Sequence, residues 1–100
     1  MHLLEKHPLF DCDLEAAALW YGVRDPAVAE RLIEEVASAI RIVVSDPLRF
    51  PVWDGEIRRV RRHGFPYMVY FELRNNTIYL SALAHGARDL PTLLRDRRLT

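Results

Sequence analysis

The sequence predicts an α+β domain in which an N-terminal helical hairpin packs on a small antiparallel β-sheet and a short helix ends the chain. Three observations support this fold class. Apolar residues recur at helical spacing over residues 26–45, apolar and polar residues alternate over 67–74 and 77–84, and Asn75-Asn76 lies between the two alternating stretches. A chain of 100 residues, 50% of them hydrophobic, is expected to form one domain over residues 1–100.

The N-terminal residues predict an edge strand and a first helix. Residues 1–10 favour a short strand, which Pro8 restricts to the edge of a sheet or ends. Asp11 or Asp13 is expected to cap a helix over Leu14–Tyr21. Gly22 is a natural stop for that helix.

The second helix has the clearest pattern in the sequence. Asp25 is expected to be its N-cap and Pro26 its first residue. Its apolar face is predicted to hold Val28, Leu32, Ile33, Val36, Ala37, Ile40, Val43 and Val44. Asp46-Pro47 ends it, so residues 23–25 form the turn of an antiparallel helical hairpin.

A connecting loop is expected over Leu48–Gly55, and the side chains of Phe50 and Trp53 are expected to be buried beneath it. Residues 56–62 begin the sheet. Ile57 and Val60 lie three residues apart and therefore on opposite faces of a strand.

Two alternating stretches predict a β-hairpin that ends near His85. The apolar positions expected on its buried face are Tyr67, Val69, Phe71 and Leu73, then Ile78, Leu80, Ala82 and Ala84. Asn75 and Asn76 both tolerate positive φ and suit a two-residue turn. Beyond the hairpin, Asp89 is expected to cap a short helix over Leu90–Arg98.

The net charge of zero conceals an asymmetry between the two halves. Residues 1–48 hold four Lys/Arg and nine Asp/Glu, whereas residues 49–100 hold ten arginines and five Asp/Glu. Arginine pairs bidentately with phosphate or carboxylate, so the second half suits a polyanion or an acidic protein segment. The alternative is that the two halves attract each other within the fold.

Cysteine content and hydropathy point to the cytoplasm. The single cysteine, Cys12, excludes an internal disulfide and fits a reducing cytosol. No apolar run approaches the roughly 18 residues that a membrane span needs, and no secretory signal pattern is present, so no membrane partner is expected.

Four arginines form a dense cluster on the strand expected over residues 56–62. Strand alternation places Arg59 and Arg61 on one face and Arg58 and Arg62 on the other. They could bind a nucleic-acid backbone or an acidic partner. The alternative is a charged edge strand that resists aggregation.

His85 and Arg88 follow the last strand. Histidine can accept or donate a proton near pH 7, and a nearby arginine can stabilise a phosphorane, so the two could support metal-free RNA cleavage. The alternative is that His85 is a hydrogen-bonded strand end.

Three aromatic residues lie near the arginines in the sequence. Phe65 and Tyr67 are expected to pack in the core, whereas Tyr70 alternates to the other face and is the better candidate for stacking on a base.

No metal or cofactor is expected. The spacing of His2, His7 and His63 is not that of a metal site. Four glycines, with no glycine-rich phosphate loop, argue against nucleotide binding.

An ordered set of motifs resembles the RelE/ParE superfamily, the toxins of type II toxin–antitoxin systems often labelled plasmid stabilisation proteins. The motifs are HPLFDCDLEAAALWY ending at 21, then ERLIEEVASAI, DPLRFP at 46–51, IRRVRRHGFPYMVYFEL at 57–73 and IYLSALAHGARD at 78–89. The most specific part is FPY before a strand together with the AxxHxxR ending formed by Ala82, His85 and Arg88.

The resemblance implies a small antiparallel sheet with two N-terminal helices, and one of two targets. ParE-like toxins inhibit DNA gyrase, whereas RelE-like toxins cleave mRNA in the ribosomal A site. Arg59, Arg61 and Arg88 match cationic positions of the nuclease branch, with His85 near its acid/base position. The lysines typical of RelE sites are absent and no tyrosine follows Tyr79. These departures favour the ParE-like or an unassigned branch, while His85 keeps the nuclease branch open.

The resemblance also implies a cognate antitoxin that wraps the toxin with an extended or helical, often acidic, segment to form a hetero-oligomer. Arg58, Arg59, Arg62 and Tyr70 are the candidate binding residues. Three functions are open: a gyrase inhibitor, a ribosome-dependent endoribonuclease using His85, Arg88 and Arg61, or an inactive member that only binds its partner.

Overall fold

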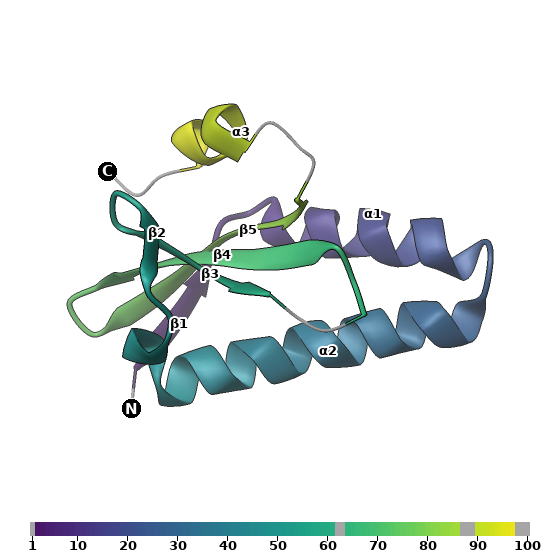
Figure 1. Ribbon diagram of the computed structural model, residues 1–100, viewed down its shortest axis with the longest axis horizontal. Helices are drawn as coiled ribbons and strands as arrows, with labels where there is room; N and C mark the ends of the chain where they lie inside the picture. Colours follow the sequence, from purple (N-terminus) through teal and green to yellow (C-terminus); the bar gives the residue numbers. More distant parts are fainter. Residues whose placement is uncertain (1, 62–63, 87–89, 98–100) are drawn as a thin grey trace.

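The chain forms a five-stranded sheet with two helices on one face and a third helix on the other (Figure 1). The computed structural model describes residues 2–61, 64–86 and 90–97. Its elements are β1 (Leu3–Lys6), α1 (Phe10–Gly22), α2 (Pro26–Ser45), the 3₁₀ turn η1 (Pro47–Arg49), β2 (Val52–Asp54), β3 (Ile57–Arg61), β4 (Tyr67–Arg74), β5 (Thr77–His85) and α3 (Leu90–Asp96).

The strand order is β1-β5-β4-β3-β2, with β1 parallel to β5 and the other pairs antiparallel. The predicted fold class, the helical hairpin and the terminal helix are confirmed, but the sheet is mixed. The reason is connectivity: α1 and α2 separate β1 from the other strands, so no tight turn imposes an antiparallel direction on it.

The first helix begins earlier than its sequence suggests. Its N-cap is Leu9, which makes no side-chain cap hydrogen bond, so the predicted Asp11 or Asp13 cap and the start at Leu14 are wrong. Phe10, only 1% exposed, opens the helix by packing into the core. The predicted stop at Gly22 is confirmed.

The second helix follows its sequence signals. The Asp25 carboxylate accepts a hydrogen bond from the Ala27 backbone N–H at 3.0 Å, and Pro26 occupies the first turn. The helix ends at Ser45, immediately before Asp46-Pro47. The residues that it buries are Leu32, Val36, Ala39 and Val43.

The segment predicted as a loop over Leu48–Gly55 contains the end of η1 and all of β2. Both aromatic residues are partly buried against the sheet as expected, but on different partners. The Phe50 ring lies 6.2 Å from the Phe71 ring, and the Trp53 ring lies 5.4 Å from the Tyr70 ring. Packing of these rings gives β2 an anchor that three residues alone would lack.

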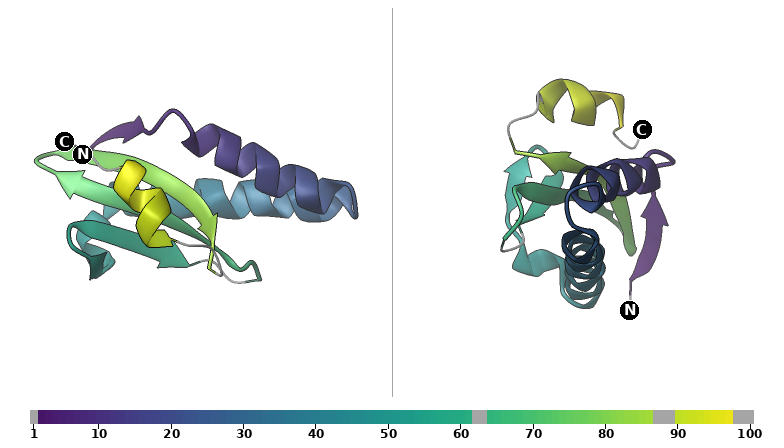
Figure 2. Two further views of the ribbon diagram at one scale, coloured as in Figure 1. Left: turned by 90° about the horizontal axis from the view of Figure 1, so that it is seen from above. Right: turned by 90° about the vertical axis from the view of Figure 1, so that its right-hand side faces the viewer.

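Side chains from the two faces of the sheet form two separate clusters, because both faces are covered (Figure 2). On the helix face, Val60, Val69 and Phe71 pack with residues of α1 and α2. On the opposite face, here called the α3 face, Ile57 and Tyr70 pack with residues of α3. The expectation that Ile57 and Val60 lie on opposite faces is confirmed.

A β-bulge changes which residues of β5 face the helices. Phe71 pairs with Leu80 and Tyr70 pairs with Ala82, so Ser81 has no partner on β4. One extra residue reverses the two-residue alternation. The expectation that Ala82 and Ala84 share a face with Ile78 and Leu80 is therefore wrong: both alanines pack on the α3 face, and Leu83 packs on the helix face.

The turn between β4 and β5 is as predicted. Arg74 pairs with Thr77, which leaves Asn75-Asn76 as a two-residue connection, and Asn75 has a φ of 54°. The last helix, α3, ends at Asp96. Asp89 and Arg98, its predicted cap and predicted end, lie outside the described residues.

One ion pair joins the first helix to the end of the chain. The Arg97 guanidinium donates to both oxygens of the Asp13 carboxylate, and the two side chains are 7% and 9% exposed. Asp13 also accepts from the Leu83 backbone N–H at 3.1 Å, and Arg97 donates to the Ser81 carbonyl at 3.4 Å. The pair thus satisfies backbone groups of β5 beside the bulge, where β1 no longer pairs with it.

Replacing Asp13 by alanine is expected to lower the free energy of unfolding by about 3–5 kcal/mol, because Arg97 is then left buried without its counter-ion. Asp11→Ala is the matched control in the same helical turn, since Asp11 pairs with Lys6 at the surface and such pairs contribute about 0–1 kcal/mol. Urea unfolding measures both. Equal losses for the two variants would contradict a structural role for the Asp13–Arg97 pair.

Alkaline pH is expected to destabilise the chain through Tyr70. Burial raises the pKa of the Tyr70 phenol above its ordinary value of 10.0, and this outweighs the lowering by the nearby Arg59. The folded chain holds the phenol proton more tightly than the unfolded chain. The contribution of the protonated Tyr70 phenol to the free energy of unfolding is therefore fully present below pH 10. It is lost as the pH rises through the raised pKa of the folded chain.

Chemical unfolding between pH 8 and pH 11 tests this expectation. Tyr70→Phe should flatten the alkaline fall. Tyr79→Phe serves for comparison, because burial also raises the pKa of Tyr79. A Tyr70→Phe variant whose stability falls as steeply as that of the parent would show that Tyr70 is not responsible.

Candidate functional site

The arginines of β3 divide between the two faces of the sheet, as alternation predicts. Arg59 pairs with Tyr70, and Arg61 pairs with Met68, so both lie on the α3 face. Arg58 lies on the other face and donates to the Phe50 carbonyl at 2.6 Å. Arg62 lies outside the described residues.

Only one of these three described arginines is free to meet a partner directly. The Arg59 guanidinium lies 5.0 Å from the centre of the Trp53 ring and hydrogen-bonds the Tyr70 phenol. Arg58 is half-buried by its bond to the chain. Arg61 is exposed. Arg58 and Arg59 therefore help to hold the segment 50–53 against the sheet.

Tyr70 is not on the surface. Its side chain is 0% exposed and lies beneath Trp53 and residues of α3, with its hydroxyl 3.6 Å from the Met68 sulfur. As the alternation of β4 predicts, Tyr70 lies on the face opposite the α1–α2 hairpin. That face is covered by α3. In this arrangement its ring cannot stack on a base.

Of the remaining residues proposed for a nuclease site, the two that the structure describes, His85 and Arg61, are not brought together. His85 pairs with Tyr67, and their rings lie 5.5 Å apart on the helix face. Arg61 pairs with Met68 on the α3 face, two strands away from β5. His85 and Arg61 therefore project from opposite sides of the sheet. Arg88 lies outside the described residues.

His85 instead lines a groove between α1 and the last residues of β5, here called the α1 groove. The groove has a volume of about 350 Å³. Its lining residues are Leu9, Cys12, Asp13, Ala16, Ala17, Trp20, Tyr67, Leu83, Ala84, His85 and Arg97. Because Asp13 and Arg97 neutralise each other, the groove presents a mostly apolar wall with the exposed His85 imidazole beside it.

Trp20 is the main groove residue that the sequence did not single out. Its side chain is 53% exposed, and the Arg24 guanidinium lies 3.7 Å from the centre of its ring. Trp20 also contacts the Tyr21 ring at 4.9 Å, and Tyr21 contacts Phe65. Exposed tryptophan and arginine are typical of binding hot spots. The available signal was a Trp and an Arg four residues apart, on one side of a helix.

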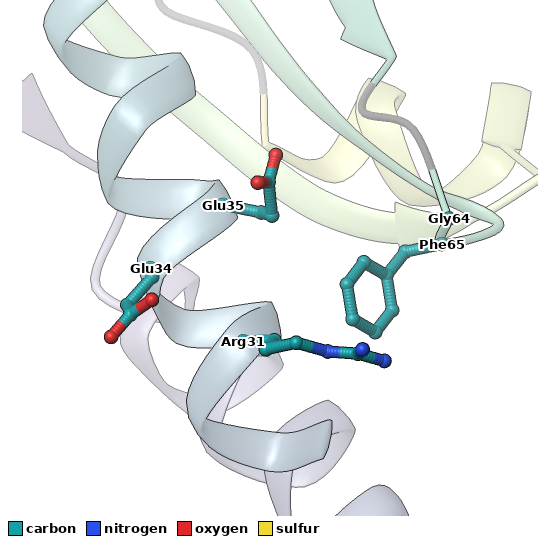
Figure 3. A pocket seen from close by; sticks show the side chains of 5 residues that line it. All are labelled: Arg31, Glu34, Glu35, Gly64 and Phe65. Atoms are coloured by element: carbon teal, nitrogen blue, oxygen red, sulfur yellow. The ribbon is translucent and has the colours of Figure 1, made fainter. Parts of the chain in front are cut away.

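A second hollow lies between α2 and the residues before β4 (Figure 3). In it the Arg31 side chain extends past the Phe65 ring, whereas Glu34 points away across the helix. Glu35 and Gly64 complete the lining, and the volume is about 420 Å³. Its charges are of both signs and none of the predicted site residues line it.

The described residues contain no group of three or more His, Cys, Asp and Glu side chains placed to hold a metal ion. Within the same ranges, no helix is long and apolar enough to cross a membrane.

Comparison with known proteins gives the family. The family model described as the ParE toxin of the type II toxin–antitoxin system parDE matches residues 4–90. No curated protein matches the chain by sequence. A solved structure described as the chromosomal ParDE TA system from P. aeruginosa has a TM-score of 0.74 at 16% identity, covering 85% of this chain and 96% of that one. The structural likeness establishes the shared fold, and the family model establishes that this chain belongs to the ParE toxins of type II toxin–antitoxin systems.

Proposed function

We propose that this ParE-family toxin arrests growth by binding DNA gyrase and blocking it, with no bond-making chemistry of its own. Membership of the ParE family makes it the toxin of a module whose antitoxin neutralises it. Gyrase as the target rests on the resemblance to ParE-like toxins drawn from the sequence.

The observation that supports the proposal is the separation of His85 from Arg61, the two described members of the set proposed for a nuclease site. A general acid and a cation that stabilises the transition state must reach the same phosphate, within a few ångströms of each other. His85 and Arg61 lie on opposite faces of the sheet. The chain also departs from the RelE branch, because it has neither the lysines typical of that branch nor a tyrosine after Tyr79. These departures agree with a function that is not nucleolytic.

Purified toxin is expected to inhibit DNA supercoiling by gyrase and to leave ribosome-bound mRNA intact. In bacteria, pulse labelling after induction should show a fall in DNA synthesis with protein synthesis initially spared. His85→Ala should retain both effects within about twofold, because on this proposal His85 performs no proton transfer.

Two results would overturn the proposal. Cleavage of mRNA that His85→Ala abolishes would make the chain a RelE-like endoribonuclease. No effect on either synthesis, by a chain that still binds its antitoxin, would make it an inactive binding member of the family.

Among the described arginines of β3, we assign the partner-binding contribution to Arg61. It is exposed, whereas Arg58 and Arg59 bond to their own chain. Arg61→Ala should weaken antitoxin binding or gyrase inhibition about threefold or more without changing stability. Arg58→Ala should lower stability instead, since it removes the donor to the part-buried Phe50 carbonyl. Calorimetric titration and thermal unfolding separate the two effects, and the reverse pattern would contradict the assignment.

A further inference from the structure

Helix α1, taken with its two cap residues, carries apolar stripes on opposite sides. One stripe packs into the core and consists of Phe10, Leu14, Ala17 and Tyr21. The other, here called the α1 seam, is exposed and consists of Leu9, Cys12, Ala16, Leu19 and Val23. A helix that is apolar on all sides is normally buried on all sides. Among the described residues, only the first stripe has a cover.

The spacing of the α1 seam is suited to a second helix. From Leu9 to Val23 its residues follow one another at alternating intervals of three and four positions. This is the spacing of the a and d positions of a heptad repeat, which places a narrow apolar line against a neighbouring helix. The seam therefore fits an amphipathic helix that lies along α1.

The seam is accessible to a partner. Leu19 is 69% exposed and Val23 is 76% exposed. The end of the α1–α2 hairpin that holds them extends beyond the sheet (Figure 1, Figure 2). Trp20 lies beside the seam, with the Arg24 guanidinium over its ring. The first three seam residues also line the α1 groove, so a helix bound along the seam would cover the groove as well.

The charges beside the seam distinguish the possible occupants. Asp11 and Glu15 lie one helical turn apart on the same side of it, and both are exposed. An acidic antitoxin segment would meet these like charges, which disfavours it here. A second copy is also disfavoured, because two antiparallel α1 helices related by a two-fold axis bring Glu15 close to its own counterpart. A helix with basic residues beside its apolar line would complement this side of α1.

We propose that the α1 seam binds an amphipathic helix of DNA gyrase whose apolar line is flanked by basic residues, with Trp20 as the aromatic anchor beside it. This rests on the proposed function and adds to it the surface of the toxin and the chemistry of the segment that it contacts. Tryptophan and arginine together at a contact commonly supply much of the binding energy, and Trp20 and Arg24 lie together here.

Inhibition of purified gyrase by toxin variants tests the inference. Leu19→Asp places a carboxylate in the seam at an exposed position, so it should leave the fold intact. It should raise the toxin concentration that half-inhibits supercoiling at least about tenfold. Leu19→Ser, a milder change, should act in the same direction. Thermal unfolding checks that each variant folds.

The matched control is Ile33→Asp, because Ile33 is an exposed apolar residue of α2 that lies outside the seam. It introduces the same charge and should inhibit gyrase within about twofold of the parent. Equal losses at Leu19 and Ile33 would overturn the inference, since the seam would then have no special part in the contact.

A charge reversal tests the composition of the partner helix. Glu15→Lys places a cation where basic residues of the partner are expected, so it should weaken inhibition about fivefold, and added salt should reduce the difference. Glu30→Lys makes the same change at an exposed position of α2 and serves as the control. Stronger inhibition by Glu15→Lys than by the parent would mean an acidic partner helix and would overturn the assignment.

The remaining outcomes separate this inference from the proposed function. A parent chain that leaves gyrase active removes the proposed function and the inference with it. A parent that inhibits gyrase, beside a folded Leu19→Asp that inhibits it equally, overturns the inference alone. If Leu19→Asp loses antitoxin binding and keeps gyrase inhibition, the seam belongs to the antitoxin. If the parent sediments as a dimer that Leu19→Asp converts to a monomer, the seam belongs to a second copy. Either result overturns the assignment to gyrase.

Discussion

The central hairpin of β4 and β5 is buried on both faces, and this requirement shapes the rest of the molecule. Two strands cannot hide both of their faces from water by themselves, so one layer of helices must cover each side. The α1–α2 hairpin covers one face over Val69 and Phe71. The short α3 covers the other over Tyr70 and Ala82. Because α3 has only seven residues, its placement depends on the long-range bonds of Arg97 just beyond it.

Double-sided burial also explains why Arg61 and His85, the described candidate catalytic residues, do not converge. A strand sends neighbouring side chains to opposite faces, and here a layer of helix lies over each face. Charged residues close in sequence on β3 are therefore separated by the sheet itself. Instead, two of these arginines make contacts with nearby segments: Arg58 donates a hydrogen bond to the Phe50 carbonyl, and Arg59 lies against the Trp53 ring. Arg58 and Arg59 thereby help to hold the segment around the short β2 against the sheet.

The surfaces left outside these layers are suited to macromolecular contacts. One is the α1 groove, where the exposed Trp20 ring and the His85 imidazole lie at the end of the sheet. The other is the open edge of β1, with its apolar pocket against α2. They lie at different parts of the chain and offer different chemistry, since one presents aromatic side chains and the other presents backbone groups.

The sequence by itself determined the features that depend on near neighbours. Asp25 and Pro26 start α2 because a cap involves residues two or three positions away. The Asn75 turn and the alternation of β4 are equally local. The ordered motifs also pointed to the toxin superfamily, and the match of the ParE model to residues 4–90 confirmed it.

Tertiary structure decided what depends on residues far apart in the chain. From the sequence, Asp13 is predicted to cap a helix. In the folded chain its carboxylate instead accepts hydrogen bonds from Arg97, which lies 84 positions away. The extra residue Ser81 reverses the facing of the end of β5, and nothing in an Ala-rich strand signals where a bulge will fall. Tyr70 alternates away from the core as its sequence indicates, yet α3 buries it. Local periodicity specifies which way a side chain points, whereas only the packed chain specifies what lies there.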